Sequence, residues 1–134
     1  MLVTSEHPEH PVVYAFDSHR GLGGTRWIAG EPGEQTVIVA FDAPEAVGRV
    51  ILEVEEPEVV RTQELQLAIS SDGGRTYRHV LRQEYNFSPP GTTFEREDWA
   101  VSAAGATHLR LQVKPDKGDK PCRATLTSLL VLRR

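Results

Sequence analysis

The sequence predicts an all-β protein, an antiparallel two-sheet, jelly-roll-like β-sandwich of about eight strands. Apolar residues recur at every second position in several segments, which is the period of a strand with one buried face. Clusters of Gly, Pro, Asp and Ser separate these segments, as expected for short strands joined by turns. No segment shows a convincing 3.6-residue apolar period, so amphipathic helices are not predicted.

Four segments carry the alternation most clearly. In one of them Leu65, Leu67 and Ile69 fall on one face, while Glu64 and Gln66 fall on the other. Such a strand buries one face and exposes its opposite face to water. The four segments are residues 35–41, 48–55, 64–70 and 107–113.

Weaker patterns predict the remaining strands and the connections between them. Ala43–Val47 is expected to form one short helical turn, and Asp72-Gly73 to supply the positive-φ pair of a tight hairpin. Trp27 and Trp99 are expected in the core. The weaker strand candidates are Val12–Phe16, Trp27–Ala29, Tyr77–Gln83, Thr93–Val101 and Ala124–Leu132.

The length of 134 residues suits one domain. We expect residues 1–11 to form a flexible N-terminal segment and residues 12–134 to form a single sandwich. The formal net charge of −4 is unevenly distributed along the chain. Residues 1–71 hold 4 basic and 12 acidic side chains, whereas residues 72–134 hold 11 basic and 7 acidic side chains. This asymmetry has meaning for a partner only if the basic side chains share one surface; otherwise the fold mixes the two halves.

The sequence favours a cytoplasmic location. Cys122 is the only cysteine, so an internal disulfide is impossible. The first residues resemble no secretion signal, and no apolar run is long enough to span a membrane. Cys122 lies near Lys120 and Arg123, which favours the thiolate, but a lone thiol near strand ends is more often inert.

Neither a metal nor a cofactor is predicted. His7-Pro8-Glu9-His10 brings two imidazoles and a carboxylate into a short span, and such ligands suit zinc. A flexible, proline-containing segment is nevertheless a poor preorganised site. Gly21–Gly24 looks only superficially like a phosphate loop, because neither a Gly-Lys-Ser/Thr sequence nor a helix follows.

Catalysis has little support in the sequence. Glu95 and Glu97 fall on one strand face with Asp98 beside them, and paired carboxylates carry out glycoside hydrolysis when suitably spaced. An enzyme hypothesis based on these three residues predicts a pocket that contains carboxylates with perturbed pKa values. No nucleophile–base motif or zinc signature accompanies them.

Aromatic and basic side chains point more strongly to binding. Tyr85 and Phe87 precede a Pro-Pro-Gly loop, and aromatic rings at loop tips stack on sugars or bases. The alternative is that both rings pack at the end of the sandwich. The preceding hairpin carries three arginines, Arg75, Arg78 and Arg82. Arginine side chains bind hydroxyls, carboxylates or phosphates.

The order of several motifs resembles the galactose-binding-domain-like β-sandwiches, a group that includes the discoidin and coagulation-factor type C domains and carbohydrate-binding modules. The resemblance covers roughly residues 12–132. The matching segments are Ala15-Phe16-Asp17, the glycines of residues 21–24, Thr25-Arg26-Trp27, the Ser71-Asp72-Gly73 turn followed by Tyr77, and Leu109-Arg110-Leu111.

This resemblance implies a non-catalytic module that binds a ligand, most often a carbohydrate, at loops on one end of the sandwich. The residues that it suggests are His19, Arg20, Arg75, Tyr85 and Phe87. Its frequent calcium site uses an early Asp/Thr loop, matched by Asp17 and Thr25, and a Glu in the final strand. Residues 126–130 contain no Glu, so calcium is not predicted.

A shorter resemblance links Gly33–Thr36 and Asn86–Pro89 to the N-terminal domain of the scaffold protein of DNA single-strand-break repair. It implies an alternative function, an intracellular module that binds protein or nucleic acid. In that case the basic surface around Arg75, Arg78 and Arg82 would carry the binding. Salt distinguishes the two hypotheses, because only binding to nucleic acid weakens steeply as salt rises.

Overall fold

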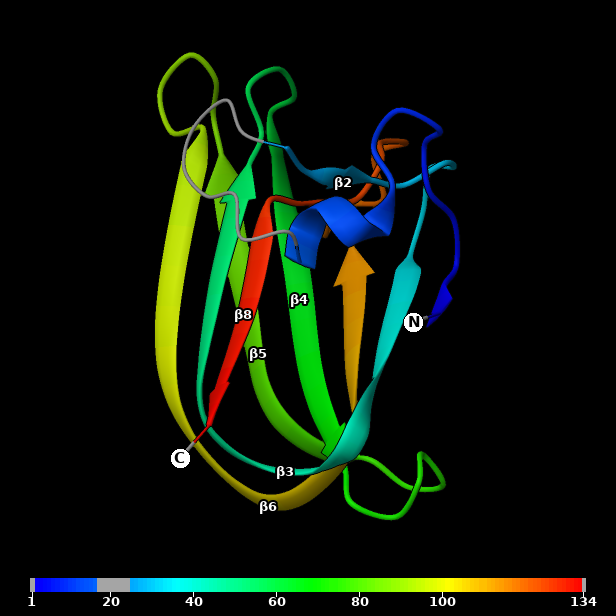
Figure 1. Cartoon of the computed structure of the whole chain (residues 1–134). Helices are drawn as coiled ribbons and strands as arrows, with labels where there is room; N and C mark the ends of the chain where they lie inside the picture. The colour runs from blue at the N-terminus through cyan, green and yellow to red at the C-terminus, as the bar shows by residue number, and fades with distance from the viewer. Residues whose placement is uncertain (1, 17–24, 134) are drawn as a thin grey trace.

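The computed structural model describes residues 2–16 and 25–133 and shows a sandwich of eight strands and one short 3₁₀ helix (Figure 1). The predicted fold class is confirmed. The elements are β1 (Leu2–Val3), η1 (Val12–Phe16), β2 (Trp27–Ile28), β3 (Gln35–Glu55), β4 (Arg61–Ser70), β5 (Arg78–Phe87), β6 (Phe94–Lys114), β7 (Thr125–Leu126) and β8 (Ser128–Arg133).

Two long, bent strands belong to both layers of the sandwich. β3 and β6 each have 21 residues and pair antiparallel with one another on both sides of their bends. One layer has the order β1-β3-β6-β4-β5; in the other, β8 pairs with the second half of β3. The two predicted strands 35–41 and 48–55 are therefore one strand, as are 93–101 and 107–113.

The bend of β3 replaces the predicted helical turn at Ala43–Val47, so this prediction was wrong. Register shifts interrupt the β3–β6 ladder between Ala40 and Arg49. Such bulges bend a strand without ending its pairing. The alanines of this segment favour a helix only weakly. The hydrogen bonds that β3 makes with β6 on both sides of the bend keep the segment in the sheet instead.

Residues 12–16 are also corrected, from a strand to the 3₁₀ helix η1. Pro11 precedes it, and Tyr14 N donates to Pro11 O at 3.1 Å. The Glu6 carboxylate accepts from Val12 N at 2.7 Å and satisfies a donor at the helix start. Val12 and Ala15, three residues apart, are both buried, as one face of a 3₁₀ helix requires.

The strand pairing extends into the segment that the sequence predicts as flexible. β1 pairs with β3, and Thr4 N donates to Thr36 O at 3.0 Å. The Ser5 hydroxyl accepts from Gly30 N at 3.0 Å. Among the described residues, strand pairing therefore extends as far as Leu2.

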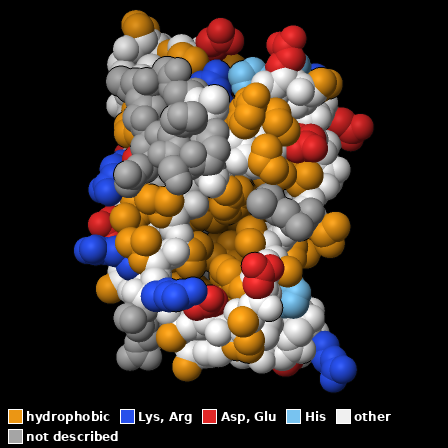
Figure 2. All heavy atoms as spheres, viewed as in Figure 1, with side chains coloured by type: hydrophobic (Ala, Val, Ile, Leu, Met, Phe, Trp, Pro, Cys, Tyr) orange, Lys and Arg blue, Asp and Glu red, His pale blue; other side chains and the backbone are white. Residues whose placement is uncertain are grey.

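The core lies between the inward faces of the two layers. The alternating residues of β3, β4 and β6 supply most of it, as the sequence predicts. Trp27 is fully buried, which confirms its predicted place, whereas Trp99 is partly buried and packs against the core. Figure 2 shows apolar side chains in a hollow between the layers on the face viewed in Figure 1.

The connection between β4 and β5 is not the tight hairpin predicted from Asp72-Gly73. Positive φ falls on Gly73 and Gly74, with values of 80° and 85°. The Asp72 carboxylate accepts hydrogen bonds from Ser70 Oγ at 2.7 Å and from Thr76 N at 2.9 Å. Bonds from the Thr76 side chain and backbone, and then from Ser70, hold the pKa of Asp72 well below its usual range.

The lowered pKa of Asp72 predicts a pH-dependent contribution to stability. A carboxylate with a depressed folded-state pKa stabilises the fold above its unfolded pKa, and this contribution is lost as pH falls below that value. We expect Asp72→Asn to lower the urea midpoint at neutral pH, with a difference from the wild type that shrinks toward about pH 2.5.

Asp42→Asn, at an exposed position on the β3 bend, is the matched control and should show little of this pH dependence. Urea unfolding of the three proteins across the acid range checks the expectation. A difference between Asp72→Asn and wild type that stays constant with pH would contradict it.

Candidate functional site

A pocket lies at the end of the sandwich where β2 and β7 pair. This end of the sandwich is at the top of Figure 1. Its volume is about 290 Å³. Four segments meet around it: β2 with the residue before it, the end of β3 with the loop to β4, the start of β4, and the start of β7 with the residues before it. The lining residues are Arg26, Ile28, Glu55, Glu56, Glu58, Val59, Arg61, Pro121, Cys122, Arg123 and Thr125.

Arg61 joins the segments at the base of this pocket. Its side chain is only 1% exposed and pairs with Glu56, with Nη2 2.6 Å from Oε1. Nη1 donates to Pro115 O at 3.2 Å and to Arg123 O at 2.7 Å. A buried guanidinium is tolerated only when it is paired and hydrogen-bonded, so these contacts fix three chain segments relative to one another.

Glu56 shapes the neighbouring loop. Its second carboxylate oxygen accepts from Glu58 N at 3.0 Å and from Val59 N at 3.3 Å. The backbone N–H of Glu56 also donates to Thr93 O at 2.7 Å. Pro57 restricts the backbone of this loop, and the Glu56 carboxylate accepts hydrogen bonds from the two N–H groups that follow Pro57. The loop is therefore held in one conformation before any ligand binds.

The wall of the pocket carries side chains of both charges. Arg26 Nη1 lies 3.3 Å from Glu55 Oε1, and both side chains are largely buried. Glu58 and Arg123 are exposed at the rim. Carboxylates accept hydrogen bonds from hydroxyls and guanidinium groups donate to hydroxyl oxygens, so the set suits a small ligand rich in hydroxyl groups.

The predicted ligand residues do not meet in this pocket. His19 and Arg20 lie outside the described residues. Arg75 lies in the β4–β5 loop, at the lower end of Figure 1 and therefore at the opposite end of the sandwich. The family resemblance indicates loops at one end, but the sequence does not say which loops share an end.

Tyr85 and Phe87 are core residues, so their prediction as stacking rings is corrected. Their exposed fractions are 3% and 2%. Both side chains point from β5 toward the interior, which is the alternative that the sequence left open. Burial first, and then the charges of Glu97 and Glu95, raises the pKa of the Tyr85 hydroxyl, so it stays protonated.

Sequence reasoning missed the residues that line the pocket. A weak signal exists in the run Glu55-Glu56-Pro57-Glu58, because acidic residues after a buried strand and around a proline indicate an exposed loop. The sequence has no comparable signal for Arg61, since its burial depends on carbonyls from residues 115 and 123.

The carboxylates of the enzyme hypothesis gain no support from the described residues. Glu95 and Glu97 do share a face of β6, the inner one, near Tyr85. Asp98 is on the outer face and pairs with Arg49 at 2.7 Å. None of the three lines the pocket described above.

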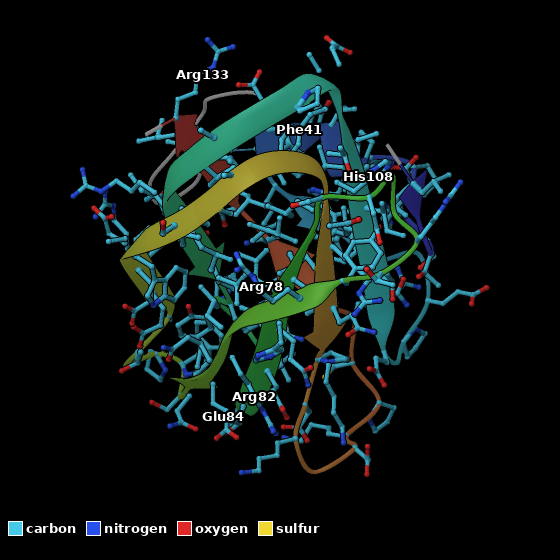
Figure 3. All side chains as sticks on the ribbon, turned by 90° about the horizontal axis from the view of Figure 1, so that it is seen from below. Phe41, Arg78, Arg82, Glu84, His108 and Arg133 are labelled. Atoms are coloured by element: carbon cyan, nitrogen blue, oxygen red, sulfur yellow. The ribbon has the colours of Figure 1, made fainter. Side chains whose placement is uncertain are left out.

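The basic residues of the second half lie among acidic partners. Arg82 pairs with Glu64, Arg96 with Glu53 at 3.6 Å, and Arg133 with Glu45 at 2.9 Å, and each pair joins the two halves of the chain. Figure 3 shows Arg78, Arg82 and Glu84 following one another along β5, away from Arg133 on β8. The fold therefore mixes the two charged halves, and this arrangement does not support the nucleic-acid alternative.

Only part of the calcium site that the resemblance implies lies among the described residues. Asp17 is outside the described residues, and β8 with the residues before it contributes no carboxylate. Ca²⁺ binding normally uses several carboxylates among six to eight oxygens. Within residues 2–16 and 25–133, no helix has the length and apolar character to cross a membrane.

Comparisons with known proteins support the fold through structure rather than sequence. No protein-family model and no curated protein matches the sequence. Among solved structures, chitosan-binding module 1 of a chitosanase/glucanase from Paenibacillus sp. IK-5 has a TM-score of 0.67 at 20% identity, over 98% of this chain and 92% of that one.

Two modules from Clostridium perfringens are also similar. A family 32 carbohydrate-binding module from a family 31 glycoside hydrolase has a TM-score of 0.70 at 13% identity, over 100% of this chain and 89% of that one. Another module, in complex with GalNAc-β-1,3-galactose, has a TM-score of 0.65 at 20% identity, over 98% of this chain and 92% of that one. The chain therefore has the galactose-binding-domain-like sandwich fold of these modules, as its motifs predict.

Proposed function

We propose that this domain is a non-catalytic module that binds a carbohydrate in the pocket around Arg61. The observation that carries the proposal is the preformed arrangement of Arg61, Glu56, Arg26 and Glu55 between loops at one end of the sandwich. Structures with the same fold were solved with GalNAc-β-1,3-galactose, 4,5-unsaturated mannuronic acid and Lewis b, which supports this ligand class.

The pocket provides an apolar wall and hydrogen-bonding side chains, the two features that a sugar-binding site needs. Ile28, Val59 and Pro121 form apolar wall for the C–H faces of a pyranose. Glu58 and Arg123 reach from opposite segments and bind hydroxyls by accepting and donating hydrogen bonds, respectively. Arg61 and Glu56 do not need to move, because their own contacts already hold the loops, and this lowers the entropy lost on binding.

The size of the pocket limits the ligand. Pockets for drug-sized ligands span about 300–1,000 Å³, and this one, at about 290 Å³, is just below the lower limit of that range. We therefore expect it to enclose one sugar ring, with the rest of a glycan extending into solvent. A terminal sugar is the simplest ligand of this kind.

Glu58→Gln and Arg123→Ala are expected to weaken binding of the best ligand from a glycan array. Each change removes one charge-assisted hydrogen bond, so the dissociation constant should rise by roughly tenfold. Isothermal titration calorimetry measures it. Both side chains are exposed, so thermal stability should stay close to that of the wild type.

Two controls make this test specific. Arg75→Ala at the opposite end and Tyr85→Phe in the core should leave binding unchanged. Affinity for a neutral sugar should change little as salt rises, whereas binding to DNA would weaken steeply. Binding lost with Arg75→Ala but kept with Glu58→Gln would place the site elsewhere; an array without any bound glycan would contradict the proposal.

A further inference from the structure

A tight turn at residues 7–10 brings the rings of two histidines together in an edge-to-face arrangement. His10 N donates to His7 O at 2.9 Å, and the two residues form an isolated antiparallel bridge. Their ring centroids lie 5.4 Å apart at an angle of 61°. Glu9 N donates to His7 Nδ1 at 3.1 Å, which directs that ring toward the turn. The sequence predicts a flexible segment here, and the turn is instead defined by these bonds.

The turn is also attached to the body of the sandwich. His7 N donates to Ile28 O at 2.8 Å, and Ile28 N donates to His10 O at 3.1 Å. Both histidines are therefore fixed to the same residue of β2. β2 in turn pairs with β7, so the backbone that carries the imidazoles belongs to a hydrogen-bonded layer rather than to a free end.

The side chains of this turn present a set of metal-binding atoms. One ring nitrogen from each of His7 and His10 and a carboxylate oxygen of Glu9 lie within 4.8 Å of one another. The His10 Nδ1 atom is buried and has no hydrogen-bond partner. A buried polar atom without a partner calls for an explanation, and a bound ion supplies one.

We propose that His7, Glu9 and His10 form a binding site for a divalent transition-metal ion of the zinc type. Two imidazoles and one carboxylate are the ligand types that zinc prefers, and hard cations such as Ca²⁺ and Mg²⁺ prefer oxygen alone. Zinc–nitrogen bonds of about 2.0–2.1 Å place ligand atoms roughly 3.3 Å apart, so the side chains, now within 4.8 Å, close in by up to about 1.5 Å on binding. A neutral imidazole has one free lone pair, so His7 gives up the hydrogen bond from Glu9 N when it ligates the ion.

Such a site has a structural consequence. The ion would crosslink the two sides of the turn that holds the N-terminal segment on β2, with water in the remaining position of a tetrahedral ion. Ile28, which anchors the turn through its backbone, lines the pocket around Arg61 with its side chain. Metal binding thereby stabilises the N-terminal segment and β2 in the folded state.

Titration of the chelator-treated full chain with zinc chloride tests the proposal. We expect saturable binding of one equivalent and a rise in Tm that grows with zinc concentration, because the ion binds the folded state. His10→Asn and Glu9→Gln should each raise the dissociation constant at least about tenfold. His79→Asn, at an exposed histidine on β5, is the matched control and should bind like the wild type.

Competition with other cations makes the result specific. Excess magnesium or calcium should not displace zinc, because both ions prefer oxygen ligands alone. Far-UV circular dichroism of the metal-free variants shows whether each has folded. If His10→Asn does not fold, Glu9→Gln, which changes an exposed side chain, tests the site by itself. Absence of saturable binding, or equal binding by wild type, His10→Asn and Glu9→Gln, would overturn the proposal.

Discussion

Arg61→Met is expected to destabilise the domain more than other single changes around the pocket. The substitution keeps much of the buried volume but removes the positive charge that pairs with Glu56. It also leaves the carbonyls of Pro115 and Arg123 without this donor. Breaking a buried ion pair by removing one partner costs about 3–5 kcal/mol, because the other charge stays buried.

For a domain of this size the loss corresponds to a fall in Tm of about 10 °C or more. Thermal and urea unfolding at neutral pH measure it. Arg123→Met is the matched control, because it removes an exposed arginine from the same pocket while its backbone carbonyl remains.

A double-mutant cycle separates the pair from the rest of the site. Glu56→Gln combined with Arg61→Met should be less destabilised than the sum of the two single variants, because no unpaired charge remains. If Arg61→Met changes the unfolding free energy by less than about 1 kcal/mol, the same as an exposed pair, then Arg61 does not hold the loops together.

Trp27→Ala is expected to have an effect of similar size through packing. Trp27 is fully buried, and its indole N–H donates to Ser5 O at 3.1 Å. Truncating a buried tryptophan costs about 3–5 kcal/mol, and the exact loss depends on how far the cavity closes. Urea unfolding followed by circular dichroism measures the loss.

Trp27→Phe provides the graded comparison. Phe restores most of the buried apolar area but no indole donor, so we expect only about 1–3 kcal/mol of destabilisation. Because Trp27 lies between Arg26 and Ile28, both of which line the pocket, Trp27→Phe should also weaken sugar binding slightly. Equal stability of Trp27→Ala and wild type would show that β2 contributes little to the fold.

The strands were predictable because burial of one sheet face imposes a period of two. Leu65, Leu67 and Ile69 are buried on β4 as their alternation indicates. The predicted strand boundaries were less accurate, because an interruption of the period of two does not show whether a strand ends there. The sequence shows an interruption at Ala43–Val47, but only the partner strand β6 determines whether the chain ends a strand there or bends through it.

The candidate site was less predictable, for a different physical reason. Tyr85 and Phe87 have the same chemistry in a core as at a sugar site, and only the parity of β5 against its neighbour decides between them. Likewise, His7 and His10 are near in sequence, yet the hydrogen bonds to Ile28 that hold them together come from a strand that is distant in sequence.

The sequence by itself determined the all-β class, the inward-facing residues of the main strands and the likeness to galactose-binding-domain-like sandwiches. The first two depend on patterns within one segment, where local periodicity and turn chemistry dominate, and the likeness depends on the order of short motifs along the chain. Tertiary structure alone decided which loops share an end, and hence that Arg75 is remote from the pocket while Arg61 is at its base. Those facts depend on contacts between residues such as 61 and 123, and such contacts form only when the whole sandwich folds.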